Sequence, residues 1–372
     1  MNNNDIDKYL FALKRDLWLA IYDKTFPIPK ATLDLSKNEG YFHYTSLTSA
    51  LNILKLSTDN ESDKVQRREG KFVSLWASHF LFLNDAQELL DGLKKVCDNM
   101  ENKINQIKSP NHSDAQEWLK QYKDLFLSLM PNNLYAAPNN FILCFCSDGN
   151  LLSQWEHYGK ESGIAIEFDL DNCLFEGFFP LRPMPNPTLG KPTMFADPIK
   201  VTPRKVIYNQ NNKEKAIKKI LTKSAVKNSN SVHIMAMQAL AAASFMKHPC
   251  FENEHEVRLM FSPNYFSENT YDEIAKLIHY REINGIVKPY MEIHIKHEYS
   301  GKNIIKSITV GPGHNQNLVL NAILKLVQTR FAEKIEPIEE PIKWEEEPDH
   351  NYKFAKVGNI EVRYSTIPFR GF

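Results

Sequence analysis

The chain has 372 residues, of which 42% are hydrophobic, and this content is enough for a substantial buried core. Basic and acidic residues number 45 each, so the formal net charge of +0 excludes recruitment of nucleic acid or anionic membrane by a global field. The amino terminus lacks the apolar run of a signal peptide, and no stretch approaches the roughly 18 apolar residues that cross a bilayer. The five cysteines are scattered without CxxC spacing. We therefore expect a cytoplasmic protein with reduced thiols and no membrane association.

The amino-terminal part alternates predicted helices and strands. Apolar residues at helical spacing predict an amphipathic helix over 5–22, which could pack on the core or bind a partner protein. An aromatic run at 41–44 predicts a strand, and Thr45 or Ser46 can cap the helix that follows. A second apolar run at 72–76 predicts another strand.

The middle of the chain is the most clearly patterned part. The segment at 141–149 is a near-continuous apolar run that ends in polar turn residues, as expected for a central buried strand. A short helix that stops at Gly159 and a strand at 163–168 follow. Prolines at 180–204 predict an extended loop, which could serve as a lid. A long helical stretch is expected over 213–247.

The last part of the chain contains more predicted strands. They are expected at 255–261, near 290–295 and at 359–367. Residues 304–327 predict a strand, a glycine-rich turn and a helix. The irregular alternation favours an α+β fold, with mixed or antiparallel central sheets flanked by helices, over a strict βαβ array.

Three regions are predicted along the chain. Residues 1–36 form an N-terminal helical extension, 37–330 a single α+β core domain, and 331–372 a C-terminal extension packed on the core.

Four polar clusters lie near predicted strand ends, where rigid backbone can hold side chains toward a cleft. The first contains His43, which can hydrogen-bond a ligand hydroxyl, although a lone histidine is more typical of a satisfied structural residue. The second contains Asn84, Asp85 and Glu88, whose spacing is that of a capping box. A metal pair could use the same two carboxylates, but no other ligand spacing lies nearby.

The third cluster follows the predicted central strand. Trp155 and Tyr158 are three residues apart and therefore share one helical face. Such a pair can stack on a flat ring, while core packing explains the tryptophan equally well.

The fourth cluster is an ExExR segment. Glu254, Glu256 and Arg258 alternate onto one face of a predicted strand, and Val257 and Leu259 lie on the other face. Two carboxylates and a guanidinium are costly to bury unless they are paired or put to use. The segment predicts either a solvent-facing ion ladder or an acid, base or charge stabiliser.

Read in order, five segments resemble a bacterial family known as domain of unknown function 2971. They are FHYTS with a helix ending in LNIL, then LNDAQE, CFCSDGNLLSQWEHYGKESGIAIEF, KHPCFENEHEVRLMF and ITVGPG. Together they span roughly residues 40–315. The WxxYG element with its following strand and the ExExR element make the resemblance fairly specific. The family name implies no reaction.

A more distant resemblance implies a chemistry. The strand with His43, Tyr44 and Thr45, a central strand leading to aromatics, and a glutamate on a late strand are similar to the order of motifs in diphtheria-toxin-type ADP-ribosyltransferases. In that family a histidine bonds a ribose of NAD, aromatics enclose nicotinamide, and a glutamate stabilises the ribosyl cation. The central region here lacks the usual Ser-Thr-Ser phrase.

This second resemblance assigns roles to residues of the chain. NAD would be the substrate, Glu256 would be catalytic, Glu254 would orient the acceptor, and His43 would hold the ribose. The residues implied to contact NAD are His43, Tyr44, Thr45, Ser147, Trp155, Tyr158 and Arg258. Ser147, Trp155 and Tyr158 would form the nicotinamide wall, and Arg258 would meet a pyrophosphate or neutralise a glutamate.

These patterns and the resemblances lead to three functional hypotheses, of which the first is implied by the resemblance to ADP-ribosyltransferases. The first is an NAD-consuming transferase, a toxin or anti-phage effector acting on a protein or nucleic-acid acceptor. The second is a non-catalytic module that senses a nucleotide or binds a partner with the same pocket. The third is a metal-dependent nuclease built on Asp85, Glu88, Glu254 and Glu256. The first requires that His43, the Trp155 and Tyr158 pair, and Glu256 line a common hollow.

Overall fold

The computed structural model describes residues 39–55, 57–58, 71–83, 92, 94–102, 116–117, 120–121, 123–124, 140–158, 163–177, 182–184, 193–195, 200–223, 238, 241–261, 275–299, 302–331, 342–347 and 351–368. The predicted N-terminal helix and the Asn84, Asp85 and Glu88 cluster lie outside these residues.

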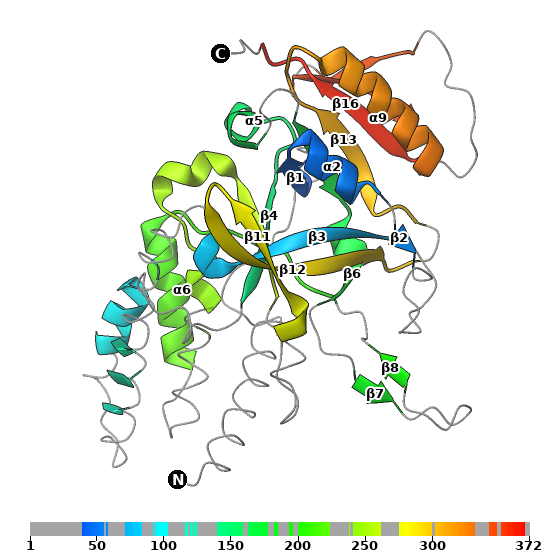
Figure 1. The fold of residues 1–372 in the computed structure, drawn as a ribbon. Helices are drawn as coiled ribbons and strands as arrows, with labels where there is room; N and C mark the ends of the chain where they lie inside the picture. The colour runs from blue at the N-terminus through cyan, green and yellow to red at the C-terminus, as the bar shows by residue number, and fades with distance from the viewer. Residues whose placement is uncertain are drawn as a thin grey trace.

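One large, mostly antiparallel sheet dominates the fold (Figure 1). Its strands are β1 (Phe42–Thr45), β2 (Ser57–Thr58), β3 (Lys71–His79), β4 (Phe141–Cys146), β5 (Ile164–Phe168), β6 (Cys173–Glu176), β9 (Arg204–Lys205), β10 (Glu256–Phe261), β11 (Ile278–Ile283), β12 (Ile286–His297), β13 (Ile305–Val310), β14 (Glu345–Glu347), β15 (Tyr352–Val357) and β16 (Ile360–Ser365). The main path is β11-β12-β3-β4-β1-β5-β13-β16-β15-β14, and β10 lies between β4 and β9. Only the β13 and β16 pair among these described strands is parallel. The predicted α+β class is confirmed.

Helices pack around this sheet. They are the α-helices α2 (Leu47–Ile53), α5 (Leu152–Tyr158), α6 (Gln210–Lys223) and α9 (Gln316–Arg330), and the 3-10 helices η3 (Phe80–Phe82), η5 (Leu170–Asn172) and η6 (Pro249–Glu254). Helix α9 lies along β13, β15 and β16, toward which it buries Ile323, Leu324 and Val327. The predicted cap of α2 is confirmed, because the hydroxyl of Ser46 accepts a hydrogen bond from the backbone N–H of Ser49 at 3.3 Å.

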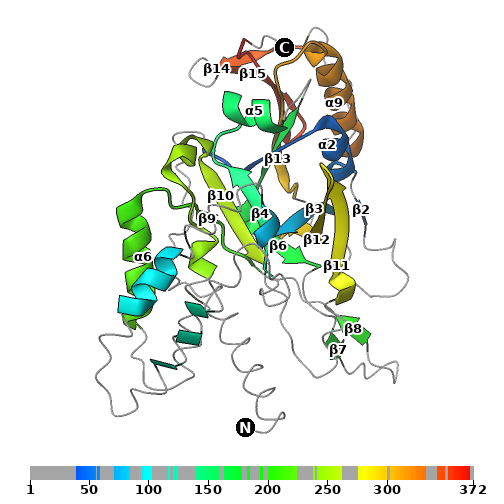
Figure 2. The same ribbon diagram turned by 60° about the vertical axis from the view of Figure 1, so that its left-hand side comes forward.

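The C-terminal segment takes part in the sheet. Strand β16 pairs with β13, where Ile308 stands opposite Val362, and β15 and β14 continue outward from β16. The final predicted strand is therefore confirmed. Figure 2 shows these strands and α9 at the end of the molecule away from α6.

The proline-rich segment departs from the prediction of an extended loop without regular structure. Strands β7 (Arg182–Met184) and β8 (Thr193–Phe195) within it pair as a separate two-stranded sheet. In a two-stranded sheet both strands are edges, so Pro183, which has no backbone N–H to donate, is tolerated on β7.

All five cysteines are free thiols. Among the described residues, no helix combines the length and apolarity that a bilayer crossing requires.

Alternation along the central strands separates two packed regions. Phe141, Leu143 and Phe145 of β4 point into the main core, together with Val257 and Leu259 of β10. The other face of β4 carries Cys144 and Cys146. A second, smaller apolar cluster lies there, formed by Phe42, Tyr44, Cys146, Trp155 and Ala165.

Strand β4 also has a split edge. Strand β10 pairs along one whole edge of β4, from Phe141 to Cys146. The other edge is shared, because β1 pairs with it at Cys146 and β3 pairs with it at Ile142 and Phe141. A gap between β1 and β3 therefore opens beside Cys144.

Candidate functional site

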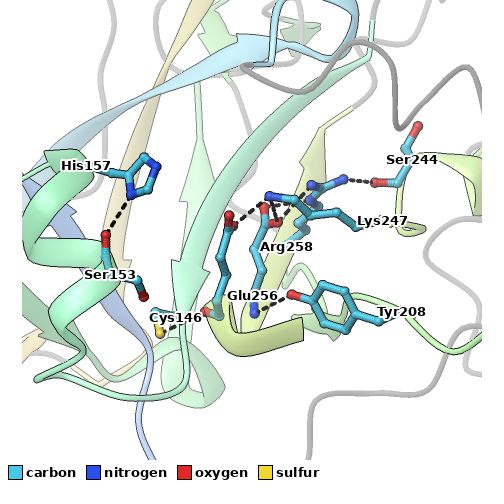
Figure 3. Close-up of polar contacts among 9 residues, drawn as sticks. Cys146, Ser153, His157, Tyr208, Ser244, Lys247, Glu256 and Arg258 are labelled. Carbon is cyan, nitrogen blue, oxygen red and sulfur yellow. Dashed lines mark hydrogen bonds and ion pairs between the residues drawn. The ribbon is translucent and has the colours of Figure 1, made fainter. Parts of the chain in front are cut away.

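A buried ion pair stands at the start of β10 (Figure 3). The Nε of Arg258 donates to one carboxylate oxygen of Glu256 at 2.7 Å, and its Nη2 donates to the other at 2.8 Å. The remaining Nη1 donates to the backbone carbonyl of Ser244 at 2.6 Å. Glu256 and Arg258 are 7% and 6% exposed. The prediction that they share one face of the strand is confirmed, and the solvent-facing ion ladder is wrong because both groups are buried.

A second ion pair adjoins the first. The ammonium of Lys247, itself buried, lies 2.6 Å from a carboxylate oxygen of Glu254 and 3.6 Å from one of Glu256. Two acids and two bases therefore form one compact cluster, which we call the ExExR cluster: Lys247, Glu254, Glu256 and Arg258. Because the positive and negative charges balance in number, the cluster can stay buried and ionised.

Glu254 joins this cluster from the end of η6 and not from the strand on which the sequence placed it. It ends η6, and the next residue, His255, adopts the left-handed conformation with φ 48° and ψ 43°. The strand begins only at Glu256. The placement of Glu254 on the strand was thus wrong, since a left-handed residue breaks the alternation of side chains that a strand imposes.

The cluster controls the ionisation of Glu256. Burial alone would raise the pKa of this carboxyl, but the charge and hydrogen bonds of Arg258 and the charge of Lys247 outweigh burial and lower the pKa to about 2. The same pairing with Glu256 raises the pKa of Arg258 despite the opposing effect of burial. Glu256 is therefore an ionised carboxylate at every physiological pH.

This lowered pKa predicts acid sensitivity. The folded pKa of about 2 lies below the ordinary glutamate pKa of 4.5, so the stabilisation is present above the unfolded pKa and is lost as the pH falls toward 2. At about 1.4 kcal/mol per pKa unit, we expect Glu256 to account for about 3 kcal/mol of lost unfolding free energy between pH 5 and pH 2. Urea unfolding across this range, compared with Glu256→Gln/Arg258→Met, measures it. An equally steep pH dependence in the double variant would contradict it.

Other side chains from distant segments line the cluster. The backbone N–H of Glu256 donates to the hydroxyl of Tyr208 at 2.9 Å. Cys144 stands opposite Arg258 across β4 and β10, and burial followed by the charge of Glu256 raises the pKa of its thiol. The sequence did not identify Lys247, Tyr208 or Cys144 as site residues. The pairing of β10 with β4 and β9 brings the segments of Cys144 and Tyr208 to the cluster, and a backbone bridge between Met246 and Ile207 holds the segment of Lys247 beside them.

Tyr158 lies near the cluster. It is the last residue of α5, which contacts η6, and it is 44% exposed. Burial of its hydroxyl raises its pKa, and the charges on Cys144, Glu256 and Glu254 add to this effect. The structure therefore places Tyr158 near Glu254 and Glu256, whereas the wider hollow predicted from the sequence also required His43 and Trp155.

Trp155 belongs to the core. It is 2% exposed, and its Nε1 donates to the side-chain oxygen of Asn150 at 3.0 Å. The ring meets Tyr44 edge-on at a centroid distance of 4.6 Å. An accessible nicotinamide wall containing Trp155 is therefore incorrect, because the indole has no free face to offer a ligand.

Tyr44, one of the predicted nucleotide contacts, forms its side-chain hydrogen bonds with the protein backbone. The Tyr44 hydroxyl donates to the carbonyl of Asp148 and accepts from the N–H of Leu151, each at 2.9 Å. Thr45 is half-buried at the end of β1, and Ser147 is buried directly after β4. Tyr44 thereby fixes the turn between β4 and α5.

His43 lies across the sheet from the ExExR cluster. Phe42 pairs with Cys146, so Phe42 shares the face of Glu256 and His43 points to the other. The His43 ring is 5.8 Å from that of Phe145, and its Nδ1 is 3.1 Å from the carbonyl oxygen of Cys144 at the gap. The common hollow containing His43 and Glu256 is therefore a wrong prediction, since strand alternation separates them.

The nuclease hypothesis has a specific difficulty at these carboxylates. Within the described ranges, no group of three or more His, Cys, Asp or Glu side chains could hold a metal ion. The carboxylates of Glu254 and Glu256 are instead neutralised by Lys247 and Arg258. Asp85 and Glu88, the other two residues of that hypothesis, lie outside the described residues.

Fold and site together define an α+β protein with a buried, charge-balanced cluster on β10, next to its central strand β4. Residues 154–259 of the chain match the model of a family described as protein of unknown function (DUF2971). This match confirms the predicted resemblance, and it covers Trp155, Tyr158 and all four residues of the ExExR cluster. No curated protein and no solved structure matches the chain.

Proposed function

We propose that the chain is an NAD-consuming, ADP-ribosyltransferase-like enzyme whose acidic residue is Glu256. The observation that supports it is a buried glutamate at the first position of β10, held by Arg258 and preceded by a turn that carries a second glutamate. Breaking the bond between ribose and nicotinamide sends the electron pair to nicotinamide and leaves positive charge on the ribosyl carbon. A fixed carboxylate stabilises such charge.

The roles differ from those first implied by the resemblance. Glu256 stabilises the ribosyl cation, Glu254 orients a protein or nucleic-acid acceptor, and the half-exposed ring of Tyr158 supplies the flat surface next to nicotinamide. Trp155 supports α5 from within, and His43 has no assigned contact with substrate. Such a transfer would modify an acceptor that matters to a cell, and a role as a toxin or anti-phage effector is therefore part of the proposal.

A test compares NAD turnover in the wild type, in Glu256→Gln and in Tyr158→Ala. We expect nicotinamide release to fall by at least about hundredfold in Glu256→Gln, because a transition-state charge loses its stabiliser. Chromatography measures nicotinamide, mass spectrometry measures the ADP-ribose added to acceptors, and melting curves verify folding. Glu361→Gln is the matched control, since Glu361 forms an analogous pair with Arg363 on β16. Equal release in wild type and Glu256→Gln would contradict the proposal.

A non-catalytic nucleotide-sensing or partner-binding module is the second candidate. It is favoured by the fact that Arg258 occupies both carboxylate oxygens of Glu256, which limits what else they can bind. For such a module, NAD or ADP-ribose would raise the melting temperature while neither nicotinamide nor a modified acceptor accumulated.

A further inference from the structure

A second polar surface lies on the same face of the sheet as the ExExR cluster, carried by β3, β11 and β12. Ser78 of β3 pairs with Ile142 of β4, and Cys144, two residues farther along, pairs with Arg258. Ser78 and Arg258 therefore project from one face. On the opposite face, Leu75, Ala77, Met291 and Ile293 enter the main core.

An arginine that has no acidic partner among the described residues stands on this surface. The Nη2 of Arg281 donates to the hydroxyl of Ser78 at 2.9 Å, whereas its Nε is buried and has no hydrogen-bond acceptor among the described residues. None of the ion pairs of the described chain includes Arg281. A buried N–H without an acceptor costs about 1–3 kcal/mol, so an anion that accepts from it would be favoured.

Aromatic rings fix this guanidinium in place. Trp76 and Tyr290 stack with centroids 4.6 Å apart and an interplanar angle of 29°. The guanidinium carbon of Arg281 lies 5.5 Å from the centroid of each ring. Held in this way, the planar fork of nitrogens loses little conformational freedom when it binds a phosphate.

The surroundings add positive charge and an open ring. Lys288 pairs with Arg281 across β11 and β12. The pKa of Lys288 is lowered, first by burial and then by the charge of Arg281. Trp76 is 46% exposed, which is unusual for so large an apolar side chain. Cationic groups next to an exposed stacked indole are the elements that bind a phosphate joined to a flat base.

We infer that Arg281, Trp76 and Tyr290 form a nucleotide subsite, in which the guanidinium binds a phosphate and the exposed indole stacks on the base. The subsite adds a binding place to the proposed function. Only the identification of the nucleotide as NAD rests on that function. Because the subsite lies on the same face of the sheet as Glu256, one extended dinucleotide could contact both the subsite and Glu256. The subsite is inferred from the geometry at Arg281 and does not depend on which reaction the protein catalyses.

The test is calorimetric titration of the full chain with ADP and with inorganic pyrophosphate. We expect ADP to bind at least tenfold more weakly to Arg281→Gln than to the wild type. Arg330→Gln, the same change at an exposed arginine at the end of α9, should leave the affinity unchanged. Trp76→Ala should weaken ADP binding but leave pyrophosphate binding unaffected. Because Arg281 makes one hydrogen bond and no ion pair with the residues that the structure describes, its variant should melt like the wild type.

The outcomes separate this inference from the proposed function. Equal ADP affinity in wild type and Arg281→Gln, or no ADP binding by the wild type, would overturn the subsite even if Glu256 supports nicotinamide release. Arg281-dependent ADP binding without any nicotinamide release would support the subsite and contradict the transferase. If Arg281→Gln failed to fold, Trp76→Ala would decide, since ADP binding independent of Trp76 also overturns the subsite.

Discussion

Glu256→Gln should destabilise the protein by about 3–5 kcal/mol at neutral pH, because it leaves the guanidinium of Arg258 buried without its counter-ion. Arg258 is 6% exposed and depends on Glu256 for two of its three hydrogen bonds. Urea unfolding measures the change. Glu256→Gln/Arg258→Met should recover most of the loss, because it removes both buried charges together.

The chain provides its own matched control for this experiment. On β16, Arg363 donates to Glu361 at 2.8 Å in the same Glu-x-Arg spacing, but Glu361 is more exposed and Arg363 also lies 3.2 Å from Glu167. Glu361→Gln should therefore cost less than about 1 kcal/mol, as exposed pairs do. A similar small cost for Glu256→Gln would mean that water reaches Arg258 and that the pair is not sealed.

Trp155→Ala should cost about 3–5 kcal/mol, since a buried aromatic ring is replaced by a cavity. The indole also loses its hydrogen bond to Asn150 and its contact with Tyr44. Thermal and urea unfolding measure the loss. Trp76→Ala is the control for stability, because Trp76 is half-exposed and should cost about 1 kcal/mol.

The opposite result would reassign Trp155. If Trp155→Ala unfolded at the wild-type denaturant concentration yet lost nucleotide binding, the indole would contact ligand, and its place in the apolar cluster would be wrong.

Strand alternation let the sequence predict the central part of the fold. The apolar run of β4 and the alternation in β10 correctly placed Val257 and Leu259 in the core and put Glu256 with Arg258 on the other face. The helix cap at Ser46 followed from local chemistry. These predictions depend on interactions within a few residues or on burial of one face, which the sequence records directly.

The site could be predicted only in part, because its geometry depends on contacts between distant segments. Lys247 precedes Glu254 by seven residues, and only the turn of η6 brings their side chains together. His255 adopts the left-handed conformation although it is not a glycine, so the sequence does not indicate this turn. Pairing Phe42 with Cys146, which turns His43 away from Glu256, is a matter of register that local patterns do not determine.

Glycine at position 311 illustrates the same limit. In the sequence, Gly311 belongs to the glycine-rich turn predicted between a strand and a helix, and the reason for the glycine is not apparent there. In the structure, a Cβ at this position would lie 2.7 Å from the ring of Trp155 and 3.1 Å from the carbonyl of Gly163. The glycine is therefore explained by close packing of the turn on the indole.

The split edge of β4 gives the two sides of the sheet a path to influence each other. A charge acts on nearby groups across a sheet, and more strongly in the low-dielectric interior of a protein than in water. Where β1 and β3 part beside Cys144, Arg281 from one side contributes, after burial, to lowering the pKa of His43 on the other. An anion that neutralised Arg281 would thus be felt by an imidazole it never touches.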